Sequence, residues 1–535
     1  MGEAKNEHIG LLRRRRYRCP VCNEYKILIT KSGEVLCANG CNVLSVQAEE
    51  TIKNKLSDGY FTTTDLEALF GFDFSIYPEI EWSKEHKSLF SRKQLIKLNN
   101  INHQHRDADN LIDDVSIEYY RQYPERDKDE RELTHYDYFF NIIEDIMVHI
   151  NLISKDMILM DFSYQLSLQH EGENRLFSIS YYYYCLSQHF YECMERIMLW
   201  FGLMYHYSFS EDGKRNTHYS IYKSIKKDPD FNNSGLRTLL ETVIGNNTRN
   251  ILLDWRSSSS HDLSKSLRNI NVDTAMKKQR YEIDIEMFSG NFEGILKITE
   301  QLQDLAIGMI NKMKELYAVT LDYNAINLLI GTGSITKLKI SESEYIHNIL
   351  TTEGAKLDKY LYSGPFHMSD KENGYLLIDV VCRLAEVIKG CSYAIFFDDE
   401  QFQGMWKGPA TIIPDIMDRQ YLVYTSAMLT MACYDKLARI IYRMYMHEEC
   451  GNYIYFENFL EKILGQAPPV ELAARIIDHE DNAFKFLAQY RNEFTHLLRK
   501  GAIYTNVMED YEDYLIVAIA YNVRHIVELI DTIYK

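Results

Sequence analysis

Two copies of a short Arg-x4-His pattern are the residues of this chain whose chemistry is easiest to define. The first copy pairs Arg256 with His261, and the second pairs Arg491 with His496. A histidine, with an ordinary pKa of about 6.5, can accept or donate a proton at neutral pH. A guanidinium is always charged and can hold two phosphate oxygens at once. Each pair is therefore suited to proton transfer beside a phosphate.

The second copy stands out because its arginine occupies an apolar position. Residues 482–499 predict a helix, and Arg491 lies on its apolar stripe between Leu487 and Phe494. Breaks of this kind gather at functional sites. The competing interpretation is a structural arginine, with a buried stem and a head that reaches water or pairs with Glu493 or a more distant acid.

The first copy contains Ser257–Ser260 between its arginine and its histidine. Serines are poor in the interior of a helix and good at its caps. A helix that begins near Thr248 is therefore expected to end or bend at these serines. Arg256 and His261 would then lie at a helix junction, more exposed than the second pair. The alternative is a capping loop with an ordinary surface histidine.

The chemistry becomes more complete if the two copies face each other. Residues five apart on one helix point about 140° apart, so a single pair forms a cramped site. Two facing pairs would surround one phosphate with two arginines and two histidines. Cleavage of RNA by its own 2′-hydroxyl needs a base, an acid and charge stabilisation, but no catalytic metal. We expect Ser257 and Asn492 to be supporting polar groups, with Asp254 and Glu493 as candidate orienting acids.

Four cysteines near the N-terminus have the spacing of a zinc site. Cys19 and Cys22 form one close pair, and Cys37 and Cys41 form another. The insert at 26–36 alternates like a β-hairpin, which is typical of a zinc ribbon. Four thiolates leave no position open for a substrate, so the expected Zn²⁺ is structural. The alternative is four cysteines that are merely part of a core.

The ribbon region differs in charge from the rest of the chain. The formal net charge of the chain is −18, yet residues 1–56 are basic, largely because of the run from Arg13 to Arg18. Such a run can bind phosphates, although it could equally be a solvated tail. The rest of the chain is acidic and repels RNA. RNA could therefore bind only where basic residues are concentrated.

The elements that would position these residues are predicted to be helices. Only 25 Gly and 9 Pro occur in 535 residues, which favours a mainly α fold of long helices with short connections. No signal peptide and no membrane-spanning segment is expected. Six further cysteines are scattered like buried thiols, which favours a reducing cytoplasm. They are Cys185, Cys193, Cys382, Cys391, Cys433 and Cys450.

The helical patterns suggest five regions. We expect a basic zinc ribbon at 1–56, a helical linker domain at 57–150, a first helical domain at 151–325, an inter-domain insert at 326–415 and a second helical domain at 416–535. The strongest single predictions are helices at about 180–207, 292–317, 420–446, 482–499 and 510–534.

The two helical domains resemble the HEPN superfamily of metal-independent ribonucleases. The resemblance rests on Tyr490-Arg491-Asn492 followed by His496, and more loosely on Arg256 with His261. It implies helical bundles, an RNA substrate, and pairing of HEPN units between chains or within one chain. Two such units in one chain are similar to type VI CRISPR effectors. Single-chain HEPN nucleases of phage-defence and toxin systems are closer in size.

Two other function classes remain open from the sequence. The chain could be a non-catalytic recognition module in which a zinc ribbon is joined to helical scaffolds. It could also be a HEPN-like partner of a nucleotidyltransferase. Other catalytic patterns are weak: Gly331-Thr-Gly333 lacks the remainder of a P-loop, and the acidic run Asp398–Glu400 is more simply a solvated loop than a metal site.

Overall fold

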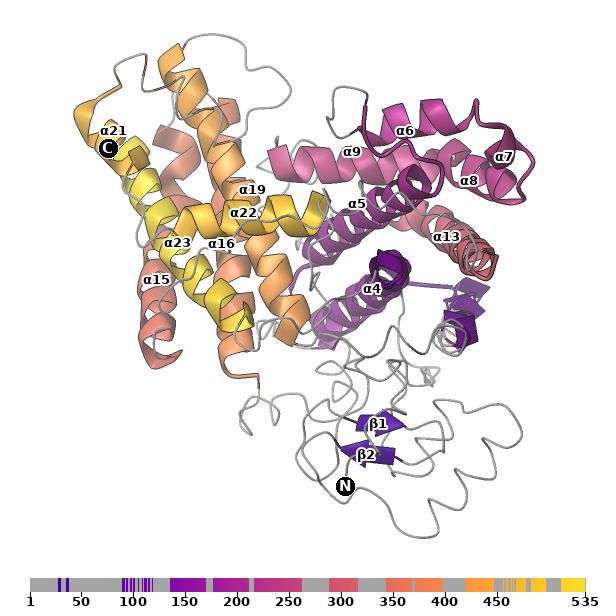
Figure 1. Ribbon diagram of the computed structural model, residues 1–535. Coiled ribbons are helices and arrows are strands. Elements are labelled where there is room, and N and C mark those ends of the chain that lie inside the picture. Colours follow the sequence, from indigo (N-terminus) through magenta and orange to yellow (C-terminus); the bar gives the residue numbers. More distant parts are fainter. Residues whose placement is uncertain are drawn as a thin grey trace, which may run out of the picture.

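Long helices dominate the computed structural model of the chain (Figure 1). Within the residues that the structure describes, the expected mainly α class is confirmed. These residues are 27–29, 35–37, 135–169, 177–210, 216–261, 288–315, 343–367, 371–397, 419–446, 468–477, 483–496 and 511–534, with single positions between 89 and 118 and between 456 and 465.

The helices form two groups that follow the order of the sequence. The first group consists of α4 (His135–Gln169), α5 (Ile179–Met204), α6 (His218–Ile225), α7 (Pro229–Asn232), α8 (Leu236–Gly245), α9 (Asn247–His261), the 3₁₀ turn η4 (Ser289–Asn291) and α13 (Phe292–Met313). The second group consists of α15 (Ser343–His367), α16 (Lys371–Ile395), α19 (Arg419–Met446), α21 (Val470–Ile477), α22 (Ala483–His496) and α23 (Tyr511–Tyr534).

Helix α5 forms the centre of the first group. It begins at an N-cap, Ser178, whose side chain accepts a hydrogen bond from the backbone of Tyr181. It packs against α4, α6 and α9. All of its residues are buried except Tyr191 and Met204. A helix this thoroughly buried has no solvent-facing stripe, so its polar residues must find partners inside the protein.

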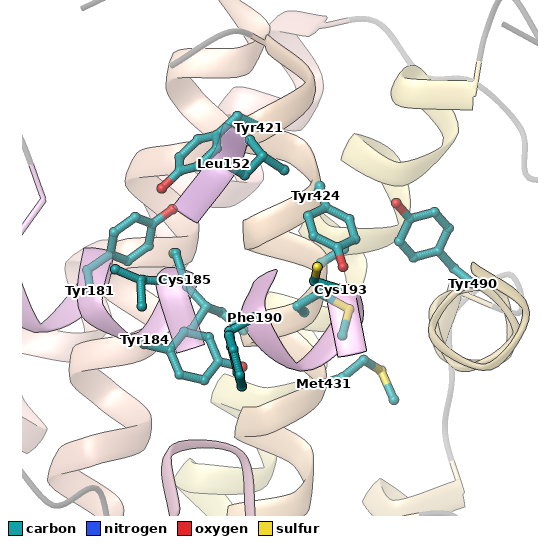
Figure 2. Packing of buried hydrophobic residues seen from close by; sticks show 14 of the residues in the cluster. Leu152, Tyr181, Tyr184, Cys185, Phe190, Cys193, Tyr421, Tyr424, Met431 and Tyr490 are labelled. Carbon is teal, nitrogen blue, oxygen red and sulfur yellow. The ribbon is translucent and has the colours of Figure 1, made fainter. Parts of the chain in front are cut away.

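The second group is built around α19. This helix packs against α16 and α23, and α15 packs against α16 and α23. Helix α22 lies across the group and contacts α19, α23 and α5. Tyr490 of α22 meets Tyr424 of α19 edge to face, with ring centroids 6.2 Å apart, in the layer where α19 also packs on α5 (Figure 2). The aromatic contact fixes α22 at the position just before Arg491.

Two of the expected region boundaries differ from the structure. Helix α4 runs without interruption through the boundary expected at 150/151. The segment expected as an insert, 326–415, contains α15 and α16, which pack against α19 and α23. The second group of helices therefore begins before residue 416. Helix α16 is buried on several sides, which weakens its apolar period, whereas α15 alternates buried and exposed positions.

A small antiparallel hairpin lies at the N-terminal end of the chain (Figure 1). Strand β1 (Ile27–Ile29) pairs with β2 (Val35–Cys37), and Ile27 is opposite Cys37. This register places Cys37 at the open end of the hairpin, beside Ile27. The segment that contains Cys22 enters the hairpin at the same end. The side chain of Cys37 and the residues Cys19, Cys22 and Cys41 lie outside the described part of the chain, so the expected Zn²⁺ site remains a prediction.

Among the described residues, no helix has the length and apolar character that crossing a bilayer requires. Cys185, Cys193, Cys391 and Cys433 are buried thiols, as expected, whereas Cys382 is only partly buried and Cys450 lies outside the described residues. Burial raises the pKa of the Cys391 and Cys433 thiols to about 12, so these cysteines are unreactive packing residues.

Candidate functional site

Helix α9 carries the first motif and continues through its serines. The sequence led us to expect a break at Ser257–Ser260 and an exposed pair, but the helix runs to His261 and the serines at 258–260 are buried. The Ser258 hydroxyl donates to the backbone carbonyls of Asp254 and Trp255. The small serine side chains let α9 lie close against α5, where the Tyr184 hydroxyl is 3.4 Å from the Ser260 hydroxyl.

His261, the last residue of α9, is bonded on both ring nitrogens. Its side chain is 5% exposed. Nδ1 lies 3.1 Å from an oxygen of Asp435, and Nε2 lies 3.2 Å from a terminal nitrogen of Arg256. A carboxylate can only accept a hydrogen bond and a guanidinium can only donate one. Nδ1 therefore carries the hydrogen and Nε2 the lone pair, so the imidazole is neutral.

The electrostatic surroundings favour this neutral form. Burial lowers the pKa of His261 below its ordinary value. The hydrogen bond to Asp435 acts in the opposite direction, whereas the positive charges of Arg256 and Arg491 lower the pKa further. A neutral histidine is the form that can accept a proton.

Arg491 of the second motif reaches the same carboxylate. Its terminal nitrogen lies 3.2 Å from the Asp435 oxygen that also faces His261. Helices α9 and α22 both contact α19, which carries Asp435 (Figure 1). The structure thus links the two Arg-x4-His motifs, which are far apart in the sequence: Arg256 contacts His261, and His261 and Arg491 both contact Asp435.

The remaining expected site residues are less fully placed. His496 ends α22, and Asn492 is in the same helix, but their side chains lie outside the described part of the structure, as does that of Glu493. Ser257 is half-buried beside Arg256. Asp254, a candidate orienting acid, is exposed. Asp435 has the orienting position instead.

Helix α19 also holds the backbone of the site. A terminal nitrogen of Arg439 donates to the carbonyl oxygen of His261 at 3.2 Å. That carbonyl is at the C-terminus of α9, where a cation is favourable. The second oxygen of Asp435 accepts from the backbone N–H of Phe456 at 3.0 Å. The acid is consequently fixed on both oxygens.

Sequence reasoning missed Asp435 and Arg439, although a signal for them exists. Both interrupt the apolar pattern of the helix at 420–446, as Arg491 interrupts that of 482–499. The same test that singled out Arg491 would have selected them. No sequence rule, however, gives the pairing of an acid with a histidine 174 positions away.

The partly accessible groups of the site are its cations and one aromatic ring. Asp435 is 2% exposed, but Arg491 is 12% exposed and Arg256 is half-buried. The guanidinium carbon of Arg256 lies 4.1 Å from the centre of the Tyr191 ring. An anion that approached from solvent would therefore meet the guanidinium groups before the acid.

Within the described residues, no group of three or more His, Cys, Asp or Glu side chains is arranged to hold a metal ion.

No protein-family model matches the chain, and no curated protein and no solved structure shows significant similarity to it. The chemistry of the site consequently rests on its own geometry.

Proposed function

We propose that this protein is a metal-independent endoribonuclease of the HEPN type, in which the two motifs of one chain form a shared site. The observation that carries the proposal is a chain of contacts: Arg256 meets His261, and His261 and Arg491 share one oxygen of Asp435. Two cations and a neutral histidine are the groups that cleavage by a 2′-hydroxyl uses. His496 would supply the second histidine.

In this mechanism the scissile phosphate binds between Arg256 and Arg491. Arg256 covers Nε2 of His261 in the unbound protein, and a phosphate that accepts from the same terminal nitrogen takes over this contact and uncovers the lone pair. His261 then takes the proton of the 2′-hydroxyl, and Asp435 stabilises the imidazolium through Nδ1. The arginines stabilise the charge of the phosphorane, and His496 protonates the 5′-oxygen that leaves.

The N-terminal region has a supporting role in the proposal. Cys19, Cys22, Cys37 and Cys41 bind one structural Zn²⁺, and the basic run before them adds affinity for RNA or a partner without taking part in the chemistry. The protein acts in the cytoplasm as part of a phage-defence or toxin system. Deletion of residues 1–56 should therefore weaken RNA binding but leave single-turnover cleavage at saturating RNA intact.

The direct test is incubation of a single-stranded RNA with the pure protein, with and without EDTA. The products should end in a 2′,3′-cyclic phosphate and a 5′-hydroxyl, because the 2′-oxygen is the nucleophile. EDTA should not inhibit short assays, and a 2′-deoxy sugar at the cut position should permit binding but prevent cleavage. Inhibition by EDTA with 5′-phosphate products would contradict the proposal.

A second candidate function is a non-catalytic recognition module. It is favoured by the burial of Asp435 and His261, since a buried ion cluster can also serve to fix two helix groups together. In that case the pure protein would bind RNA or a protein partner without cutting RNA. The His261→Ala variant would be less stable, and there would be no cleavage activity for it to lose.

A further inference from the structure

Arg256 is held on three sides in the unbound site. Its Nε donates to the side-chain oxygen of Gln188 at 3.2 Å. Its guanidinium carbon lies over the Tyr191 ring, 4.1 Å from the ring centre. One terminal nitrogen contacts His261. A guanidinium has five N–H bonds, so these two hydrogen bonds leave three for a phosphate.

The Gln188 amide can take only one orientation. Its oxygen accepts from Arg256, and its nitrogen donates to a carboxylate oxygen of Glu192 at 2.7 Å. A reversed amide would turn its N–H bonds toward the guanidinium and its oxygen toward the carboxylate, and both hydrogen bonds would be lost. Gln188 and Glu192 are each 2% exposed, so water cannot replace either bond.

Glu192 is otherwise unexpected at its position. It lies one turn after Gln188 on α5, in the layer between α5 and α4. There Nδ1 of His149 is 3.7 Å from the Glu192 oxygen that does not bond to Gln188. Burying a carboxylate is costly. The Gln188 amide links this carboxylate to Arg256, because it donates to the first and accepts from the second.

We propose that Gln188, oriented by Glu192, is a positioning residue that holds the Arg256 guanidinium where a phosphate will bind. The inference rests on the proposed function and goes beyond the motif residues. A flexible arginine loses rotational freedom when it binds an anion, and a prepositioned one has lost that freedom already. Gln188 therefore affects the rate through Arg256 and touches no substrate.

The first test replaces Gln188 with methionine, which has a similar length and no hydrogen-bonding amide. With an end-labelled single-stranded RNA of mixed sequence, kcat should fall about 10- to 100-fold, while KM changes much less. In an Arg256→Ala background the same substitution should have no further effect on kcat. The matched control is Gln303→Met, because Gln303 is equally buried and donates to the carbonyl of Ile101 far from the site.

A second pair of variants tests the orientation itself and does not depend on the methionine variant being folded. Gln188→Glu places two buried carboxylates face to face and should reduce kcat. Adding Glu192→Gln reverses the polarity of the hydrogen bond and should restore kcat, because the introduced carboxylate still accepts from Arg256 and the introduced amide now donates to that carboxylate.

The possible results separate the inference from the proposed function. Absence of RNA cleavage by the wild-type protein would remove both. Wild-type cleavage with an unchanged kcat in Gln188→Met, or a loss in Gln188→Met that is equally large in the Arg256→Ala background, would overturn the inference alone. A loss in Gln188→Glu that Glu192→Gln does not restore would also overturn it.

Discussion

A single carboxylate, Asp435, accounts for much of the site at the scale of residues. One of its oxygens faces both His261 and Arg491, and the other accepts from the backbone. Its negative charge offsets the positive charge of Arg491, which is only 12% exposed. Asp435 also decides which nitrogen of His261 has the lone pair.

The first prediction concerns this acid. Asp435→Asn should lower kcat for RNA cleavage by about 100-fold or more, because an imidazolium at His261 would lose its charged partner. The pKa of His261 should fall further, so the acidic limb of the pH–rate profile should move to lower pH. Asp531→Asn is the control at a more exposed acid, since Asp531 is bonded to Lys359 and Tyr360 away from the site. Equal losses in both variants would contradict a specific role for Asp435.

The second prediction concerns the histidines. His261→Ala and His496→Ala should each lower the cleavage rate by about 100-fold or more, because neither half-site supplies both a base and an acid. His347→Ala, on α15, serves as a control and should cleave RNA normally. Full cleavage by the double variant of His261 and His496 would exclude catalysis at these positions.

At the scale of elements, helices with a clear apolar period could be predicted from the sequence. The helices expected at 420–446, 482–499 and 510–534 correspond to α19, α22 and α23, with ends within three residues. Apolar periodicity does not predict helices that are buried on every side. Local residue preference does not predict a helix end where tertiary packing overrides it. Helix α9 continues through its serines because their small side chains fit against α5, which no local rule shows.

The pairing of elements could not be predicted from periodicity. The apolar pattern predicts which face of α19 is buried. It does not predict that α9 and α22 both pack against this helix. The convergence of the two motifs was expected only as one arrangement among several. A distant acid was one of the partners expected for Arg491, but its identity as Asp435 and its contact with His261 were not, because these partners come from distant helices.

The third prediction concerns a buried ion cluster between α16 and α19. Arg383 pairs with Asp379 and Glu386, and Lys436, next to the site acid in sequence, pairs with Asp379. Arg383→Met should cost about 3–5 kcal/mol in the free energy of unfolding, since it leaves buried carboxylates without their partner. Lys97→Met, which removes a more exposed pair, should cost less than about 1 kcal/mol. Denaturant unfolding measures both, and similar losses would contradict the argument.

The fourth prediction concerns the layer between α4 and α5. Burial lowers the pKa of His149 well below 6.5, and His189 and Arg196 lower it further. Below pH 6.5 the unfolded chain therefore binds a proton that the folded chain does not, and stability is lost as the pH falls, by up to about 1.4 kcal/mol per pH unit.

The control for this effect is the His149→Gln variant. Burial raises the pKa of Asp145 to about 6, which makes stability fall as the pH rises between about 4 and 6 and so opposes the histidine. The difference between the wild-type and variant unfolding curves isolates His149. Equal slopes for the two proteins between pH 5 and 7 would show that His149 does not contribute.

At the scale of the whole molecule, two helix groups meet at the candidate site while the hairpin lies apart from them (Figure 1). The helical groups share a large buried core. The hairpin has two three-residue strands, too little to be stable without further support. A bound metal would provide that support.

The fifth prediction follows from this difference. Elemental analysis of protein purified without chelators should give one zinc per chain. Cys37→Ser should remove the zinc and abolish the order of the ribbon but leave the main thermal transition of the helical groups in place. Zinc-free wild-type protein would rule out the site. A variant without any cooperative transition would show instead that the helices depend on the ribbon.

The arrangement of the site along the chain also has a consequence for biosynthesis. A chain is made and folds from its N-terminus, so Arg256 and His261 leave the ribosome well before Asp435 and Arg491 are made. A nascent or prematurely terminated product that ends before α19 contains one motif without the acid that orients it. If the protein cuts RNA, the messenger from which it is being translated is spared until α19 and α22 have been synthesised.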